Sequence, residues 1–193
     1  GKKETFPNPE AKLWLDRIKK AFALAEEAVV LAEAGYSEVA ASGEANTPAI
    51  FVANENLSRA LELYHEAHKL QPLAARINFD YATLSLKFGE AWDAIGGALA
   101  QDAGRQAEAD AAGKKAQAYY TRALPLFRAV PQESGSIPRE MHARSLFEAA
   151  RLLVMLNRDL QDLEQARALL EECSEVGQVT GEWKNKLDEI LNM

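Results

Sequence analysis

Residues 60–72 read ALELYHEAHKLQP, and the spacing of their small and large side chains decides the fold. Ala60, Tyr64 and Ala67 follow one another at steps of four and three, so they lie on one face of a helix. The two alanines let a neighbouring helix approach closely, and the tyrosine between them fills the next gap. Pro72 follows and ends the helix. This stretch therefore predicts a helix packed tightly against a second helix.

The same order of small, large and small side chains occurs twice more, again at steps of four and three. The third copy ends on the only cysteine of the chain, which we interpret as a small buried residue, with a reactive thiol as the alternative. One thiol can form neither an intrachain disulfide nor a cysteine-based zinc site. Three copies of the pattern predict three helical hairpins. The copies are Ala60, Tyr64 and Ala67; Ala116, Tyr120 and Ala123; and Ala166, Leu170 and Cys173.

This pattern resembles the second-helix signature of the tetratricopeptide repeat family, which has Ala, an aromatic residue, Ala and Pro at these same steps. Residues 60–72 match all four positions, and the second copy matches three. The copies begin 56 and 50 residues apart, whereas the family period is about 34, so we expect elongated helices. The resemblance implies a right-handed stack of antiparallel helical hairpins. It also implies that the first helices of the hairpins line a concave groove that holds a peptide or another ligand.

Outward from these copies, apolar residues recur at helical spacing, and no segment shows the alternation of a strand. Gly35 is expected to end the first helix, with 36–46 as a loop or a short turn, and one long helix is expected to continue through Gly89. We predict an all-α single domain over 1–193, with hairpins at about 9–72, 73–131 and 138–177 and a capping helix at about 180–192. The expected helices cover 9–35, 47–70, 73–102, 105–130, 138–156, 162–176 and 180–192.

Acidic residues outnumber basic ones by 29 to 22, which gives a net charge of −7 at pH 7. An acidic surface repels phosphate backbones, so we expect no nucleic-acid partner. The charge is uneven, because residues 1–20 hold six basic and three acidic side chains. We interpret this basic start as a solvated helix face, with contact to an anionic membrane surface as the alternative.

The chain begins with Gly1 instead of Met, which we interpret as a trimmed N-terminus. Our hypothesis for the removed part is a signal peptide or a lipoprotein leader. This hypothesis favours a periplasmic or membrane-anchored location over a cytoplasmic one, and it would bring the domain close to a membrane. No apolar run in the sequence reaches the ~20 residues that a membrane-spanning helix needs.

The sequence does not indicate catalytic machinery. His65 and His68 are three residues apart, whereas the zinc-protease motif places its histidines four apart, so we expect a solvated helix face and no metal site. Gly96 and Gly97 are not followed by the lysine of a phosphate-binding loop. The charged residues at 140, 144, 148 and 151 are expected to form an exposed ion-pair ladder. We therefore predict a protein that is not an enzyme and needs no cofactor.

A stripe of polar and aromatic residues on the predicted helix 73–102 is the candidate binding face. Its members recur at steps of three, four and seven, and tyrosine and tryptophan offer contact area with a polar tip. The alternative is that Tyr81 and Trp92 pack against the neighbouring helix. Two residues of the third hairpin complete the predicted groove. The predicted groove residues are Asn78, Tyr81, Ser85, Trp92, His142 and Arg144.

We interpret the protein as an adaptor that binds a protein or peptide partner in this groove. The alternative function is a small-ligand-binding component, similar to tetratricopeptide proteins, of a periplasmic or lipoprotein transport assembly. A closed apolar pocket between the long helices would favour the ligand-binding component. An open groove would favour the adaptor.

Overall fold

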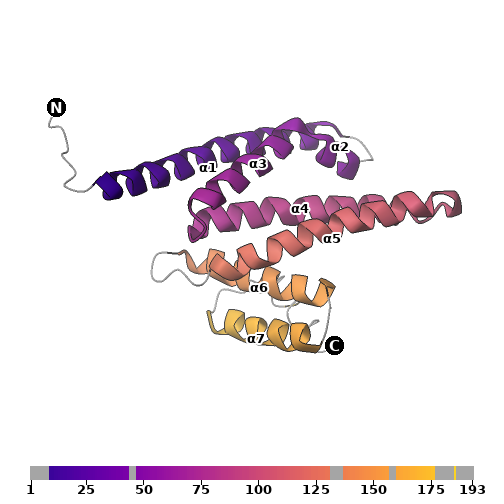
Figure 1. Ribbon diagram of the computed structural model, residues 1–193. Helices are drawn as coiled ribbons and strands as arrows, with labels where there is room; N and C mark the ends of the chain where they lie inside the picture. Colours follow the sequence, from indigo (N-terminus) through magenta and orange to yellow (C-terminus); the bar gives the residue numbers. More distant parts are fainter. Residues whose placement is uncertain (1–8, 44–46, 131–136, 157–159, 177–184, 186–193) are drawn as a thin grey trace.

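The computed structural model describes residues 9–43, 47–130, 137–156, 160–176 and 185. Within these ranges all regular structure is helical, which confirms the predicted all-α class (Figure 1). The capping helix predicted over 180–192 lies outside the described residues except for position 185. The helices are α1 (Pro9–Ala41), α2 (Thr47–Ala53), α3 (Glu55–Leu70), α4 (Ala75–Leu99), α5 (Gln106–Ala129), α6 (Arg139–Leu156) and α7 (Leu160–Val176), and the 3₁₀ turn Ala103–Arg105 precedes α5.

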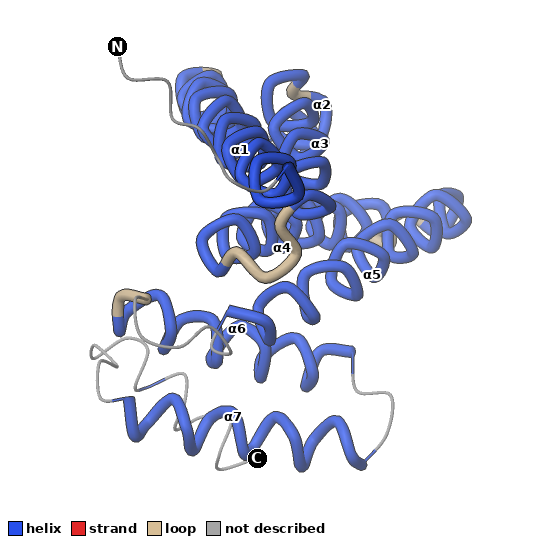
Figure 2. The backbone as a smooth tube through the Cα atoms, turned by 60° about the vertical axis from the view of Figure 1, so that its left-hand side comes forward, coloured by secondary structure: helices blue, strands red, loops and turns tan. Residues whose placement is uncertain are grey.

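Pairs of neighbouring helices form successive layers of the molecule (Figures 1 and 2). α1 packs along α3, α4 along α5, and α6 along α7, and the contact between α4 and α5 is the most extensive. The short helix α2 packs against α4. The α4–α5 pair therefore lies in the middle layer, between the α1–α3 pair and the α6–α7 pair (Figure 1).

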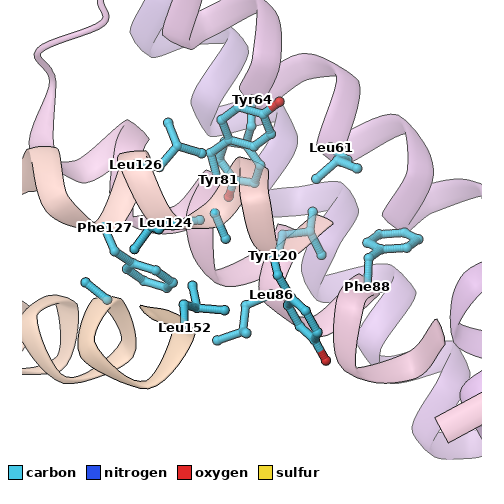
Figure 3. Packing of buried hydrophobic residues seen from close by; sticks show 14 of the residues in the cluster. Leu61, Tyr64, Tyr81, Leu86, Phe88, Tyr120, Leu124, Leu126, Phe127 and Leu152 are labelled. Atoms are coloured by element: carbon cyan, nitrogen blue, oxygen red, sulfur yellow. The ribbon is translucent and has the colours of Figure 1, made fainter. Parts of the chain in front are cut away.

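All nine residues of the small–large–small pattern are buried, with exposed fractions between 0% and 4%. Figure 3 shows Tyr64, Tyr81 and Tyr120 among leucine and phenylalanine side chains of one cluster. Cys173 is buried as predicted, and its thiol donates to the carbonyl oxygen of Ala143 at 3.3 Å. Burial raises the pKa of this thiol. The pattern therefore marks the core-facing side of the helices.

The predicted end of the first helix at Gly35 is wrong, because α1 continues to Ala41. Gly35 is buried, and a Cβ atom placed there would lie 2.6 Å from Cγ of Leu57 on α3. The role of Gly35 is therefore to let α1 and α3 approach closely, and not to end a helix. The helix stops after Ala41, next to Gly43, whose φ of +59° is the left-handed conformation typical of a residue that follows a helix.

The helix predicted over 47–70 is divided in two at Asn54. The backbone of Asn54 is extended, and its side-chain oxygen accepts a hydrogen bond from the amide of Leu57 at 3.0 Å. This is the geometry of an N-cap, which begins a new helix and satisfies one of its free amides. The break lets α2 place Phe51 edge-on against Phe88 of α4, with ring centroids 5.1 Å apart.

The long helix predicted across Gly89 is confirmed as α4. A Cβ atom at Gly89 would overlap the ring of Tyr120 on α5, so the glycine makes room for the large residue of the second pattern copy. The hydroxyl of Tyr120 then donates to Oδ2 of Asp93 at 2.8 Å. Pro125 lies inside α5, as predicted, on an exposed side of that helix.

Candidate binding face

The polar stripe predicted on α4 faces the protein interior. Asn78 and Ser85 are 0% exposed, and Tyr81 is 3% exposed. A groove residue must be accessible to a partner, so these three residues do not line an open groove in this structure. The alternative interpretation describes Tyr81 correctly, because its side chain packs in the core beside Tyr64 (Figure 3).

Two histidines of α3 contact polar atoms of Asn78 and Tyr81 in this buried stripe, whereas the hydroxyl of Ser85 has no hydrogen-bond partner among the described residues. Nδ1 of His68 and Oδ1 of Asn78 are 2.8 Å apart, and the amide of Asn78 donates to the carbonyl oxygen of Pro72 at 2.8 Å. Nδ1 of His65 and the hydroxyl of Tyr81 are 3.1 Å apart. The expectation of a purely solvated face at these histidines was therefore incomplete, because both link α3 to α4. Burial lowers the pKa of His65 and raises that of the Tyr81 hydroxyl.

The remaining predicted residues are not brought together either. Trp92 is half-buried, and the ammonium group of Lys115 lies 3.9 Å from its ring centroid. His142 is directed toward α7, where its Nε2 lies 3.6 Å from Oε1 of Glu172. Of the six predicted groove residues, only Arg144 lies on the surface described next.

The exposed side of α4 lies opposite the predicted stripe. Arg76 and Lys87 are exposed there, and Asp80 and Thr83 are half-buried. This side belongs to a surface built from the first helix of each pair, which we name the first-helix face. It comprises Ile18, Phe22 and Tyr36 of α1, Arg76, Phe79, Asp80, Thr83 and Lys87 of α4, and Met141 and Arg144 of α6.

Contacts between α4 and α6 fix one side of this face. The guanidinium carbon of Arg144 lies 5.7 Å from the ring centroid of Phe79, a cation–π contact. Further along, Arg151 of α6 binds Glu90 of α4 at 2.8 Å and Glu148 of its own helix at 2.8 Å. Glu148 is buried, and burial raises its pKa although Arg151 opposes this effect. The predicted exposed ladder is therefore wrong, because part of it is a half-buried ion-pair cluster that joins two helices.

Charged and polar groups of α1, α4 and α6 interact at the centre of the face. Burial raises the pKa of Tyr36 to about 12, while the charge of Arg144 acts in the opposite direction and that of Asp80 adds to the increase. Burial also raises the pKa of Asp80, against a hydrogen bond from Nε of Arg76 at 2.7 Å. Nε of Arg144 and Oγ1 of Thr83 are buried and have no hydrogen-bond partner among the described residues. Two polar atoms on facing helices are therefore unsatisfied.

A pocket of about 410 Å³ opens to solvent and shares Ile18, Phe22, Arg76 and Met141 with the first-helix face. Its walls come from α1, from the turn between α3 and α4, and from the beginning of α6. Most lining side chains are apolar, and the polar ones lie on the α4 side. The pocket is lined by Ile18, Phe22, Gln71, Ala74, Ala75, Arg76, Ile137, Pro138 and Met141.

The face offers groups that can contact a ligand. They are a pocket with mostly apolar lining residues, a guanidinium with an unsatisfied N–H group and an aromatic ring beneath that guanidinium. Among the described residues, no group of three or more His, Cys, Asp and Glu side chains could hold a metal ion.

Sequence reasoning missed Arg76, Thr83 and Lys87, although a signal was present. These residues are all polar, and they recur at steps of seven and four, so they share one side of a helix.

The protein-family models, the curated proteins and the solved structures include no significant match to the chain. The function is therefore inferred from the geometry of the first-helix face.

Proposed function

We propose that this protein is a non-catalytic adaptor that binds a peptide segment of a protein partner on the first-helix face. One combination of observations carries this proposal: the same face holds a solvent-open pocket lined from α1, α4 and α6, and two buried polar atoms of α4 and α6 without a hydrogen-bond partner. The layered helix pairs and the buried small–large–small pattern support a stack of the tetratricopeptide type, in which the first helices line the binding groove.

The energetics of the face favour a ligand with both apolar and polar character. An unsatisfied buried N–H group costs ~1–3 kcal/mol, and a hydrogen-bond acceptor from a ligand removes that cost. An apolar side chain that enters the pocket beside Phe22 adds ~1.5–3 kcal/mol of burial energy. A peptide can supply both at once, because its carbonyl or carboxylate oxygens lie a few ångströms from its side chains.

A small-ligand-binding component of a transport assembly is the second candidate. The pocket volume of about 410 Å³ falls within the range of ~300–1,000 Å³ that is usual for small-molecule sites. The pocket is open at the surface, however, whereas a dedicated small-molecule site buries most of its ligand. This openness favours the adaptor.

A displayed peptide library panned against the protein tests the proposal. Peptides retained by the wild type should lose about tenfold or more in affinity for Arg144→Ala and for Phe22→Ala, because each change removes a contact made only in the complex. Lys114→Ala is the control, because Lys114 is exposed on α5, away from the face. Thermal melting should show that all three variants remain folded.

Two results would reject the adaptor. The first is a set of selected peptides that bind both variants as tightly as the wild type. The second is the absence of selected peptides together with a small metabolite that raises the Tm of the wild type and not that of Phe22→Ala. The second result would favour the ligand-binding component.

A further inference from the structure

The first turns of α1 extend past the helices that cover the rest of it. α1 has 33 residues, whereas its partner α3 has 16. The first buried residue of α1 is Ala21, which packs against Ala67 and Ile77. In Figure 1 the beginning of α1 projects beyond α3 and α4. We name residues 9–20 the α1 overhang.

Large apolar side chains are uncovered on this overhang. Leu13 is 66% exposed and Trp14 is 63% exposed. Trp14 also continues the core-facing side of α1, because it precedes the buried Ala21 and Ala28 at steps of seven residues. A tryptophan in this position would lie in the core if the neighbouring helices reached far enough. Its exposure therefore indicates a surface that another body covers.

The charge of the overhang is opposite to that of the protein. The overhang contains four basic and only two acidic side chains, whereas the whole chain has a net charge of −7. None of the four forms an ion pair with a residue in the described part of the chain, and all four are exposed. They are Lys12, Arg17, Lys19 and Lys20.

We propose that the α1 overhang docks the protein on an anionic phospholipid surface. Basic side chains are attracted by anionic headgroups, and tryptophan prefers the boundary between headgroups and acyl chains. Side chains of a helix lean toward its N-terminus, so Leu13 and Trp14 lean toward the projecting end of α1. The tip can therefore enter the interface obliquely while the helix pairs remain in water. None of the described helices is long and apolar enough to cross a bilayer.

This inference does not depend on the proposed peptide site. Ile18 of the α1 overhang lines the pocket, whereas Leu13, Trp14 and the four basic residues, whose side chains would meet the membrane, do not. Membrane docking and peptide binding can therefore be tested by separate variants.

Vesicle co-sedimentation at low ionic strength tests the proposal directly. The wild type should bind vesicles of phosphatidylcholine mixed with phosphatidylglycerol and should not bind vesicles of phosphatidylcholine alone. Lys19→Glu/Lys20→Glu should reduce the bound fraction by about tenfold or more, because each lysine near an anionic surface contributes to the attraction. Lys114→Glu/Arg128→Glu is the matched control: it makes the same change in net charge at exposed positions of α5, and it should bind like the wild type.

Tryptophan fluorescence provides a second readout at the tip. Binding to the mixed vesicles should shift the emission to shorter wavelength in the wild type, and Trp14→Phe should abolish this shift. The proposal would be overturned if the wild type failed to bind the mixed vesicles, or if both double variants lost binding equally. It would also be overturned if the protein formed a concentration-dependent dimer that Trp14→Ala dissolved, since a second copy would then cover the tip. Arg144→Ala should leave vesicle binding unchanged, which separates this proposal from the peptide site.

Discussion

The two sides of α4 carry polar residues for opposite reasons. On the side that faces α3, Asn78 and Tyr81 direct their polar atoms to His68 and His65, and both are buried. On the opposite side, Arg76 and Lys87 are exposed. A polar residue at helical spacing can therefore be offered to a partner only where no neighbouring helix buries it. The first side contributes to folding, and we propose that the second binds the partner.

Truncation of Tyr81 should have the largest effect that separates the two sides. Tyr81→Ala should lower the free energy of unfolding by ~3–5 kcal/mol, because it leaves a cavity in the core cluster. Lys87→Ala, on the exposed side, should change it by less than ~0.5 kcal/mol. Urea unfolding of both variants would measure the difference. Similar losses of unfolding free energy in the two variants would show that the two sides of α4 contribute equally to folding.

The glycines of α4 allow a smaller and sharper comparison. Gly89→Ala should destabilise the protein by ~1–3 kcal/mol, because the added methyl group would overlap the ring of Tyr120. Gly97→Ala should be neutral or stabilising by up to ~1 kcal/mol, because open space surrounds that position and alanine favours the helix. Thermal melting would rank the two variants. The reverse order would contradict the close packing of α4 and α5.

Protonation of His65 should add a modest pH dependence to the stability of the fold. The pKa of His65 is lowered below its ordinary value of 6.5 by burial, so the folded state disfavours the protonated ring. Its contribution to stability is therefore complete above pH 6.5 and is lost as the pH falls through the folded-state pKa. The free energy of unfolding of His65→Asn, measured by urea titration, should fall less than that of the wild type over this pH window. An identical fall in both proteins would show that other groups control the pH dependence of stability.

The sequence predicted the class of the fold because helical periodicity extends over whole elements, and α4 continues through Gly89 as expected. It placed the end of the first helix at Gly35 instead of Ala41, and it did not locate the break at Asn54. The role of a glycine depends on what packs against it, here Leu57, and a capping asparagine inside an apolar run resembles an ordinary helix residue.

The burial of the predicted stripe could not be foreseen for a related reason. The stripe through Asn78, Tyr81 and Ser85 has the composition of a binding surface, but its burial is set by the position of α3. Arg144 was identified, and its unsatisfied Nε atom became visible only when α4 and α6 were placed together. Residue spacing shows which side chains share a helix face. It does not show which face a neighbouring helix covers.

Photo-crosslinking of a selected peptide tests the assignment of the two sides most directly. A photoreactive amino acid would replace Lys87 on the first-helix face in one variant and Ala118, exposed on α5, in another. The account predicts a crosslink to the peptide from position 87 and none from position 118. A crosslink from position 118 alone, or equal crosslinks from both positions, would contradict binding on the first-helix face.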